Sequence, residues 1–133
     1  IQNVRVLGPV RNKTQVEISK TDGYTLGIDA PVRQSGNTED TPGCVLVGPM
    51  GAVRLEEGVI CALRHMHMPE DIAREWNISN NQFVKVETCG KRRVIFDKVL
   101  VRVSPKFVLE MHVDTDEANA AGIKNGDKVF LIS

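Results

Sequence analysis

The chain has 133 residues, and its 17 lysines and arginines balance its 17 aspartates and glutamates, so its formal net charge is zero. Without excess positive charge, the sequence argues against a nucleic-acid or membrane-surface partner, because both would be attracted through phosphate groups. Hydrophobic residues make up 41% of the chain, which favours a packed fold over disorder. Every apolar run is shorter than the roughly 20 residues that a membrane-spanning helix needs.

Three cysteines, without any CxxC spacing, argue against a disulfide scaffold and for a reducing cytosol. Cys61 and Cys89 are expected to be buried strand residues rather than nucleophiles. The first residue is Ile1 rather than Met, so we expect a chain that is processed, trimmed or part of a longer product.

Segments rich in Val and Ile, most of them alternating in polarity, predict a mainly β fold. Gly-Pro, Thr-Pro-Gly and Ser-Pro pairs separate several of them, as turns do. The predicted strands are 3–7, 15–19, 44–47, 52–55, 58–63, 82–87, 92–96, 98–103, 107–113 and 128–132.

Three short segments predict helices. Residues 69–76 begin with Pro and two acidic residues, which suit the first turn of a helix. Residues 114–122 begin with the capping-box pattern Asp-x-x-Glu and end at a glycine suited to a left-handed terminator. Residues 21–27 form a weaker third case.

An internal repeat links these helices to the strands that follow. Residues 78–86 align with 123–131, and residues 27–32 are a fainter third copy. Repeated strand, short helix, turn and strand units suggest small barrels built from similar parts. A break near residues 62–64 divides the chain into two halves.

All three histidines lie in two short motifs, Arg-His-Met-His and Glu-Met-His-Val-Asp. In a strand, His65 and His67 would project from one face about 6–7 Å apart, and His112 could complete a three-histidine metal site. Such a set leaves a coordination position open, which is typical of catalytic zinc. The alternative is that His65 and His67 are polar residues on a solvent-facing strand.

Asp114, Asp116 and Glu117 follow His112 directly. Helix capping and interaction with the helix dipole are the favoured interpretation. The alternative is that one of the three acids orients a histidine ligand.

Other polar residues interrupt or flank the predicted strands. Gln15 and Glu17 share one face of an ordinary amphipathic strand, near Arg11. Arg102 interrupts an apolar alternation, so it either faces solvent or needs an anion or a carboxylate. Ser35 lies in a loop that by itself reads as a turn.

Longer motifs along the whole chain resemble the PduL-type phosphate propanoyltransferases, the phosphotransacylases of bacterial propanediol utilisation. The most specific is the final block, residues 109–122, with the sequence Leu-Glu-Met-His-Val-Asp-Thr-Asp-Glu-Ala-Asn-Ala-Ala-Gly. The other matching stretches are 5–9, Arg11, 15–19, 21–22, 26–28, 30–33, 35–36, 58–60, 64–68, 96–97 and 99–104.

The resemblance implies an acyltransferase that moves a propanoyl or acetyl group between coenzyme A and inorganic phosphate. It implies two zinc sites in an active-site cleft between two β-barrels with short capping helices. His65, His67 and His112 match the ligands of one zinc. Glu17 matches a ligand of the other, together with an HxH motif from an N-terminal segment.

The resemblance also assigns the substrate residues. Positions matching Arg11, Gln15, Ser35 and Arg102 line the cleft and bind substrate. The two arginines are the expected catalytic residues, because guanidinium groups suit phosphate recognition.

Two departures from the family pattern are expected to matter. A Ser or Thr normally precedes the proline at position 69, and Met68 stands there instead, so the following helix loses its cap. The family's N-terminal segment is absent, so the expected barrels, 1–62 and 63–133, each miss a strand, and the Glu17 metal site is incomplete.

The resemblance also implies a homodimer in the cytoplasm or inside a bacterial microcompartment. Two alternatives stay open. One is a non-catalytic or truncated barrel module that binds CoA or a partner, so that this fragment is inactive. The other is a zinc hydrolase that cleaves thioesters with water.

Overall fold

A computed structural model describes residues 1–8 and 10–132, which divide into two compact units, Ile1–Ala62 and Leu63–Ser133. We call them the N-terminal and the C-terminal unit. Strands outnumber helices in both, so the mainly β prediction is confirmed. All three predicted helices are present and short, and no helix in the described residues is long and apolar enough to cross a membrane.

The N-terminal unit is built on three short parallel strands. β5 (Val59–Ala62) lies between β1 (Val16–Glu17) and β2 (Val32–Arg33), and α1 (Lys20–Leu26) connects the outer two. Its buried core is small: Ile18, Ala30 and Val59 form one cluster, and Ile60 is also buried. Cys61 is buried on β5, as predicted.

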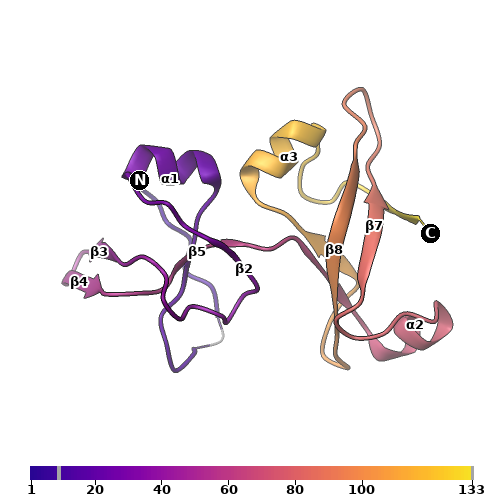
Figure 1. The fold of residues 1–133 in the computed structure, drawn as a ribbon, viewed down its shortest axis with the longest axis horizontal. Helices are drawn as coiled ribbons and strands as arrows, with labels where there is room; N and C mark the ends of the chain where they lie inside the picture. The colour runs from indigo at the N-terminus through magenta and orange to yellow at the C-terminus, as the bar shows by residue number, and fades with distance from the viewer. Residues whose placement is uncertain (9, 133) are drawn as a thin grey trace. The chain divides into compact units, whose positions relative to one another are not determined.

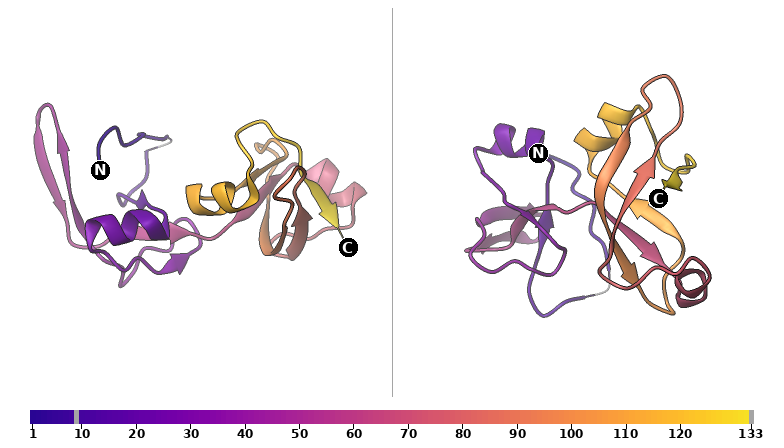
Figure 2. Two further views of the ribbon diagram at one scale, coloured as in Figure 1. Left: turned by 90° about the horizontal axis from the view of Figure 1, so that it is seen from above. Right: turned by 45° about the vertical axis from the view of Figure 1, so that its right-hand side comes forward.

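An antiparallel hairpin of β3 (Cys44–Gly48) and β4 (Gly51–Leu55) extends from this unit (Figure 2, left). The predicted strand over residues 3–7 is wrong, because this segment is irregular and Val6 is 94% exposed. Its alternating pattern is that of a strand, but a strand is stable only when a neighbour completes its hydrogen bonds.

The C-terminal unit contains a curled five-stranded sheet with the order β10-β7-β8-β6-β9 (Figures 1 and 2). Only the β6–β8 pair is parallel. The strands are β6 (His65–Met68), β7 (Phe83–Glu87), β8 (Ile95–Val103), β9 (Glu110–His112) and β10 (Phe130–Ile132). The helices α2 (Glu70–Glu75) and α3 (Thr115–Ala121) follow β6 and β9.

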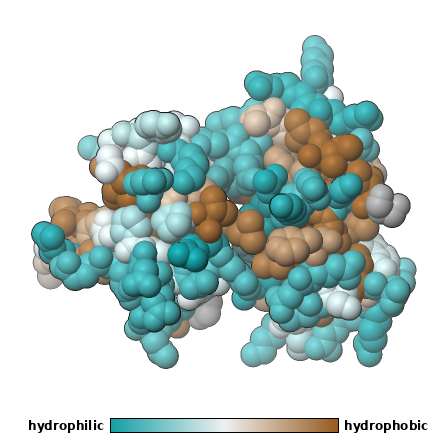
Figure 3. All heavy atoms as spheres, in the orientation of Figure 1, coloured by the Kyte–Doolittle hydropathy of each residue, from teal (hydrophilic) through white to brown (hydrophobic). Residues whose placement is uncertain are grey.

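The core of this unit is larger and is made by both helices and the central strands. Its buried members are Met66, Met68, Ala73, Val86, Phe96, Val99, Val101 and Ala121. Figure 3 shows apolar side chains, in brown, that remain among hydrophilic ones on the visible surface of each unit.

Strand β8 joins residues 95–96 of the strand predicted over 92–96 to the whole of the strand predicted over 98–103, and residues 92–94 lie outside it. Lys85 of β7 faces two residues of β8, Asp97 and Lys98, and this β-bulge interrupts the register. Lys98 has a positive φ of 53°, the conformation that accommodates the extra residue. The alternation of polar and apolar residues is interrupted at this point, and the strand continues through the bulge.

Cys89 was expected in a buried strand, and this expectation is wrong. The residue is exposed and lies in the connection after β7 has ended at Glu87.

The predicted repeat is confirmed at the helix exits. The helices α1, α2 and α3 are each followed by a left-handed residue and then an isoleucine whose N–H binds a carbonyl five residues back in the chain. The isoleucines are Ile28, Ile78 and Ile123, with N–O distances of 2.9, 2.9 and 3.0 Å. This bond satisfies a carbonyl that the end of a helix otherwise leaves without a partner.

Whether each unit forms a closed barrel stays a prediction. The curled sheet of the C-terminal unit has β10 and β9 at its two edges, as the described strands pair.

Candidate metal centre

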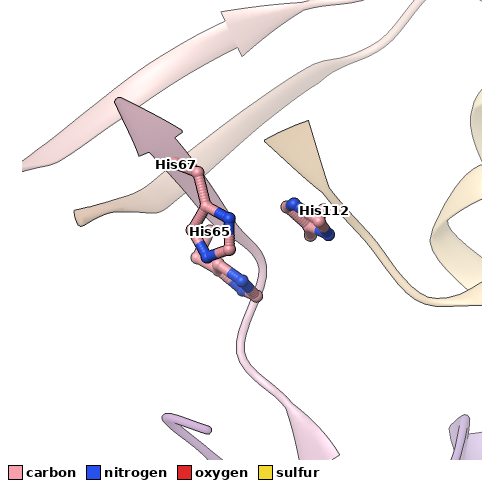
Figure 4. Close-up of side chains that lie close together, drawn as sticks. All are labelled: His65, His67 and His112. Carbon is pink, nitrogen blue, oxygen red and sulfur yellow. The ribbon is translucent and has the colours of Figure 1, made fainter. Parts of the chain in front are cut away.

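Three imidazoles gather on one face of two neighbouring strands in the C-terminal unit. His65 and His67 alternate along β6, and His112 lies opposite His65 on the antiparallel strand β9. The ring centroids are 4.5 to 5.0 Å apart, and one nitrogen from each ring lies within 4.8 Å of the others. Figure 4 shows the three rings close together. Sequence spacing predicted His65 and His67 on one face, and the strand register brings His112 to them.

Hydrogen bonds fix two of the three rings. His65 Nδ1 lies 3.0 Å from the carbonyl oxygen of Leu63, and His112 Nε2 lies 3.1 Å from Oε1 of Glu110. A carbonyl or an ionised carboxylate only accepts, so these nitrogens carry the protons. The ligating lone pairs are then on Nε2 of His65 and Nδ1 of His112.

The third ring is held by stacking. The ring of Phe107 lies 4.0 Å from that of His67, centroid to centroid, and nearly parallel to it, at 10°. Burial lowers the pKa of His67 to about 4, with further contributions from His112, His65 and Arg102, while Glu110 opposes the shift. His67 therefore stays neutral at ordinary pH, and the neutral form is the one that binds metals.

Arg102 lies beside this cluster. It is the register partner of His67 on the parallel strand β8, and it is partly buried. Register partners project from the same face of a sheet, so its positive charge acts on His67. The sequence left open whether Arg102 faces solvent or an anion, and the structure places it next to the imidazoles.

The acidic residues after His112 cap α3, as predicted. The side chain of Asp114 accepts from Glu117 N, and the side chain of Glu117 accepts from Asp114 N. Glu117 also pairs with Arg64 at 3.1 Å, and burial raises the pKa of this carboxyl. Another acid, Glu110, is in contact with His112.

The predicted residues of the N-terminal unit form a hydrogen-bonded group of their own. Gln15 donates to Glu17 at 2.6 Å and to the Ser35 hydroxyl at 3.0 Å. Arg11 Nη1 also donates to that hydroxyl, at 3.3 Å, and Gly36 N donates to Oε1 of the Gln15 side chain at 2.7 Å. The structure therefore brings Arg11, Gln15, Glu17 and Ser35 together around one loop.

The histidine cluster and the group around Glu17 differ in whether they could hold a metal ion. Within residues 1–8 and 10–132, His65, His67 and His112 are the one set of three or more potential ligands with such close atoms. Glu17 belongs to no set of three such ligands within these residues, and its carboxylate accepts a hydrogen bond from the Gln15 side chain.

Two residues of the cluster were not assigned a role from the sequence. Glu110 could have been found, because it lies two residues before His112 and therefore on the same face of a strand. Phe107 could not have been found, because it precedes β9 and meets His67 only through the fold.

The fold and the cluster define a mainly β protein with a three-histidine candidate metal centre. The family model for phosphate propanoyltransferase matches residues 1–124, and the chain belongs to this family. It is 54% identical over 133 residues to the phosphate propanoyltransferase of Thermotoga maritima, covering 99% of this chain and 63% of that protein.

Two further relatives carry the same name. The protein of Listeria monocytogenes is 52% identical over 132 residues, covering 99% of this chain and 62% of the relative. That of Citrobacter freundii is 54% identical over 126 residues, covering 94% and 60%. The chain thus spans about three fifths of the length of these relatives.

Proposed function

We propose that this chain serves the transfer of a propanoyl or acetyl group between coenzyme A and inorganic phosphate. The observation that carries the proposal is the three-imidazole cluster with an arginine beside it, in a chain of the phosphate propanoyltransferase family.

Zinc is the metal we propose for the cluster. Three neutral imidazoles suit zinc and leave one position of a tetrahedral site for substrate or water. His65, His67 and His112 would hold the ion, which when bound supplies a Lewis acid that stabilises negative charge on the thioester carbonyl or the leaving thiolate. A second zinc with Glu17 as a ligand stays a prediction.

The arginines supply the anion recognition that the reaction needs. A phosphate oxygen attacks the thioester carbonyl carbon, the carbon–sulfur bond breaks, and CoA leaves as the thiolate. Arg102 would bind phosphate oxygens through its guanidinium fork and orient the attack. We assign the same role to Arg11, with Gln15 and Ser35 as substrate-binding neighbours. This direct route needs no acyl-enzyme.

The test measures CoA release from propanoyl-CoA with and without phosphate, together with bound zinc. Direct transfer predicts that CoA release depends on phosphate and that acyl phosphate appears. Arg102→Ala is expected to raise the KM for phosphate about 10- to 100-fold, the usual loss of a charge-assisted contact. Arg93→Ala, which removes an exposed arginine of the same unit, is the matched control.

Other results would contradict the proposal in different ways. CoA release at the same rate without phosphate would indicate a thioester hydrolase. CoA binding without turnover would indicate a non-catalytic module. Exchange of label between acyl-CoA and CoA without phosphate would indicate a covalent acyl-enzyme. The homodimer and the location in the cytoplasm or a microcompartment stay predictions.

A further inference from the structure

The C-terminal unit is built from two halves that repeat with an offset of 45 residues. One half is β6–α2–β7 and the other is β9–α3–β10. In the ladders that join the halves, Met66 pairs with Met111 and Val86 pairs with Leu131. Both pairs are separated by 45 residues, so each residue at these points faces its own counterpart.

The turns that follow the helices repeat with the same offset. Asn81 and Gly126 both have a positive φ. The side chain one residue later, that of Gln82 or Asp127, accepts a hydrogen bond from the backbone N–H three residues before it. The repeat therefore extends through the whole of both halves.

This offset gives each histidine of the cluster a counterpart. His67 corresponds to His112, and His65 corresponds to Glu110. The ladder places His65 opposite His112 and His67 opposite Glu110, so the four side chains share one face of the two strands. Glu110 is thus the fourth corner of the cluster.

The contacts of the histidines in the two halves indicate the role of Glu110. The Nδ1 of His65 meets the carbonyl oxygen two residues earlier, and the Nε2 of His112 meets the carboxylate of Glu110, also two residues earlier. The same carboxylate oxygen is 4.0 Å from Nδ1 of His67. Metal-binding histidines typically donate their second ring N–H to such an acceptor, which fixes the ring and strengthens its donor nitrogen.

Direct coordination by Glu110 would have a different consequence. Four protein ligands close a tetrahedral zinc site, as in structural zinc, whereas acyl transfer needs an open position. The Glu110 side chain is also 55% exposed and so keeps water around its charge. We therefore propose that Glu110 is a positioning residue, whose carboxylate accepts the His112 Nε2 proton and presents Nδ1 as the ligand. This inference rests on the proposed metal centre.

The first experiment measures the zinc affinity of the 133-residue protein by competition with a chromophoric chelator. Glu110→Ala is expected to weaken zinc binding about 10- to 100-fold. Glu110→Gln retains a carbonyl acceptor and should stay within about fivefold of the wild type, since a neutral acceptor is weaker than a charged one. Glu75→Ala, which removes an exposed carboxylate on α2, should leave the affinity unchanged.

Two affinity results would overturn the proposal. Unchanged affinity in Glu110→Ala would show that the carboxylate does not support the site. A loss in Glu110→Gln as large as in Glu110→Ala would show a direct ligand instead.

The second experiment needs no metal and so separates this proposal from the metal centre itself. Nitrogen-15 NMR of the histidine rings, at a pH above their usual titration range near 6.5, reports which ring nitrogen carries the proton. His112 is expected as the Nε2–H tautomer in the wild type and in Glu75→Ala, and as a mixture in Glu110→Ala. An Nδ1–H tautomer in the wild type, or an unchanged tautomer in Glu110→Ala, would overturn it. Failure of the wild type to bind zinc would contradict the metal centre, while the tautomers still decide the role of Glu110.

Discussion

The two halves of the C-terminal unit share a fold but differ in what they contribute to the cluster. Both leave their helix through a left-handed residue followed by an isoleucine, Ile78 or Ile123. The first half provides two imidazoles, while the second provides one imidazole and a carboxylate. The repeated features return the chain to the sheet, whereas the side chains on the face that carries the cluster differ between the two halves.

The entrances of the two helices also differ. Asp114 caps α3 with a complete capping box, whereas Pro69 precedes α2 without any side-chain hydrogen bond. The cap predicted to be missing before α2 is indeed missing. The fold therefore tolerates a weak helix entrance where the exit and the core are intact.

The largest effect is expected for the pair at the centre of the β6–β9 ladder, Met66 and Met111. Met66 is 5% exposed and belongs to the core, whereas its counterpart Met111 is only partly buried. Met66→Ala should lower the free energy of unfolding by about 2–5 kcal/mol, because it removes buried contacts and leaves a cavity. Met111→Ala should cost less, and urea unfolding measures both. Equal losses would contradict the difference in burial.

The next effect concerns the stability of the protein at acidic pH. The pKa of His67 is lowered from 6.5 to about 4, so between these values the unfolded chain binds a proton at this position and the folded protein does not. The free energy of unfolding of the metal-free protein should therefore fall as the pH is lowered through this window. His67→Gln should remove this part of the pH dependence. Urea unfolding across the window measures it, and identical pH profiles for both proteins would rule out the shift.

A smaller effect distinguishes the two helix exits. Gly122 has a φ of 66°, and a Cβ there would lie 3.4 Å from the Cβ of Arg92. Gly122→Ala should cost about 1–2 kcal/mol, because a left-handed conformation is unfavourable for alanine. Asn77 occupies the equivalent position after α2 at φ 53°. Asn77→Ala should lower the stability less than Gly122→Ala does. Asparagine adopts a left-handed conformation less readily than glycine, so the change to alanine there is smaller. Thermal unfolding of both variants checks the order, and a larger loss at Asn77 would contradict it.

The smallest effect concerns the helix entrances. Asp114→Ala should cost about 1 kcal/mol through the lost cap. Pro69→Ala is the matched change at α2 and should have less effect, because Pro69 has no side-chain cap to lose. The difference in melting temperature between the two variants gives the measurement. Equal destabilisation would contradict the predicted difference between the two helix entrances.

Local signals made the helices predictable. Asp114, Glu117 and Gly122 define α3 within one helical segment, and their hydrogen bonds span only three or four residues. The prediction of a strand over residues 3–7 was wrong, because alternating polarity does not show whether a neighbouring strand is available for pairing. Likewise, the sequence predicted two strands separated at Asp97, whereas the structure has one strand with a β-bulge in its pairing with β7.

The sequence by itself determined the mainly β character, the helix ends, the repeat and the alternation of His65 with His67, because each depends on neighbours in the chain. Only the tertiary structure decided which strand faces β6 and in what register. That register brought His112 and Arg102 to the cluster, stacked Phe107 on His67 and made Glu110 the fourth corner. Such contacts join strands far apart in sequence, and their geometry is set by the packing of the whole sheet.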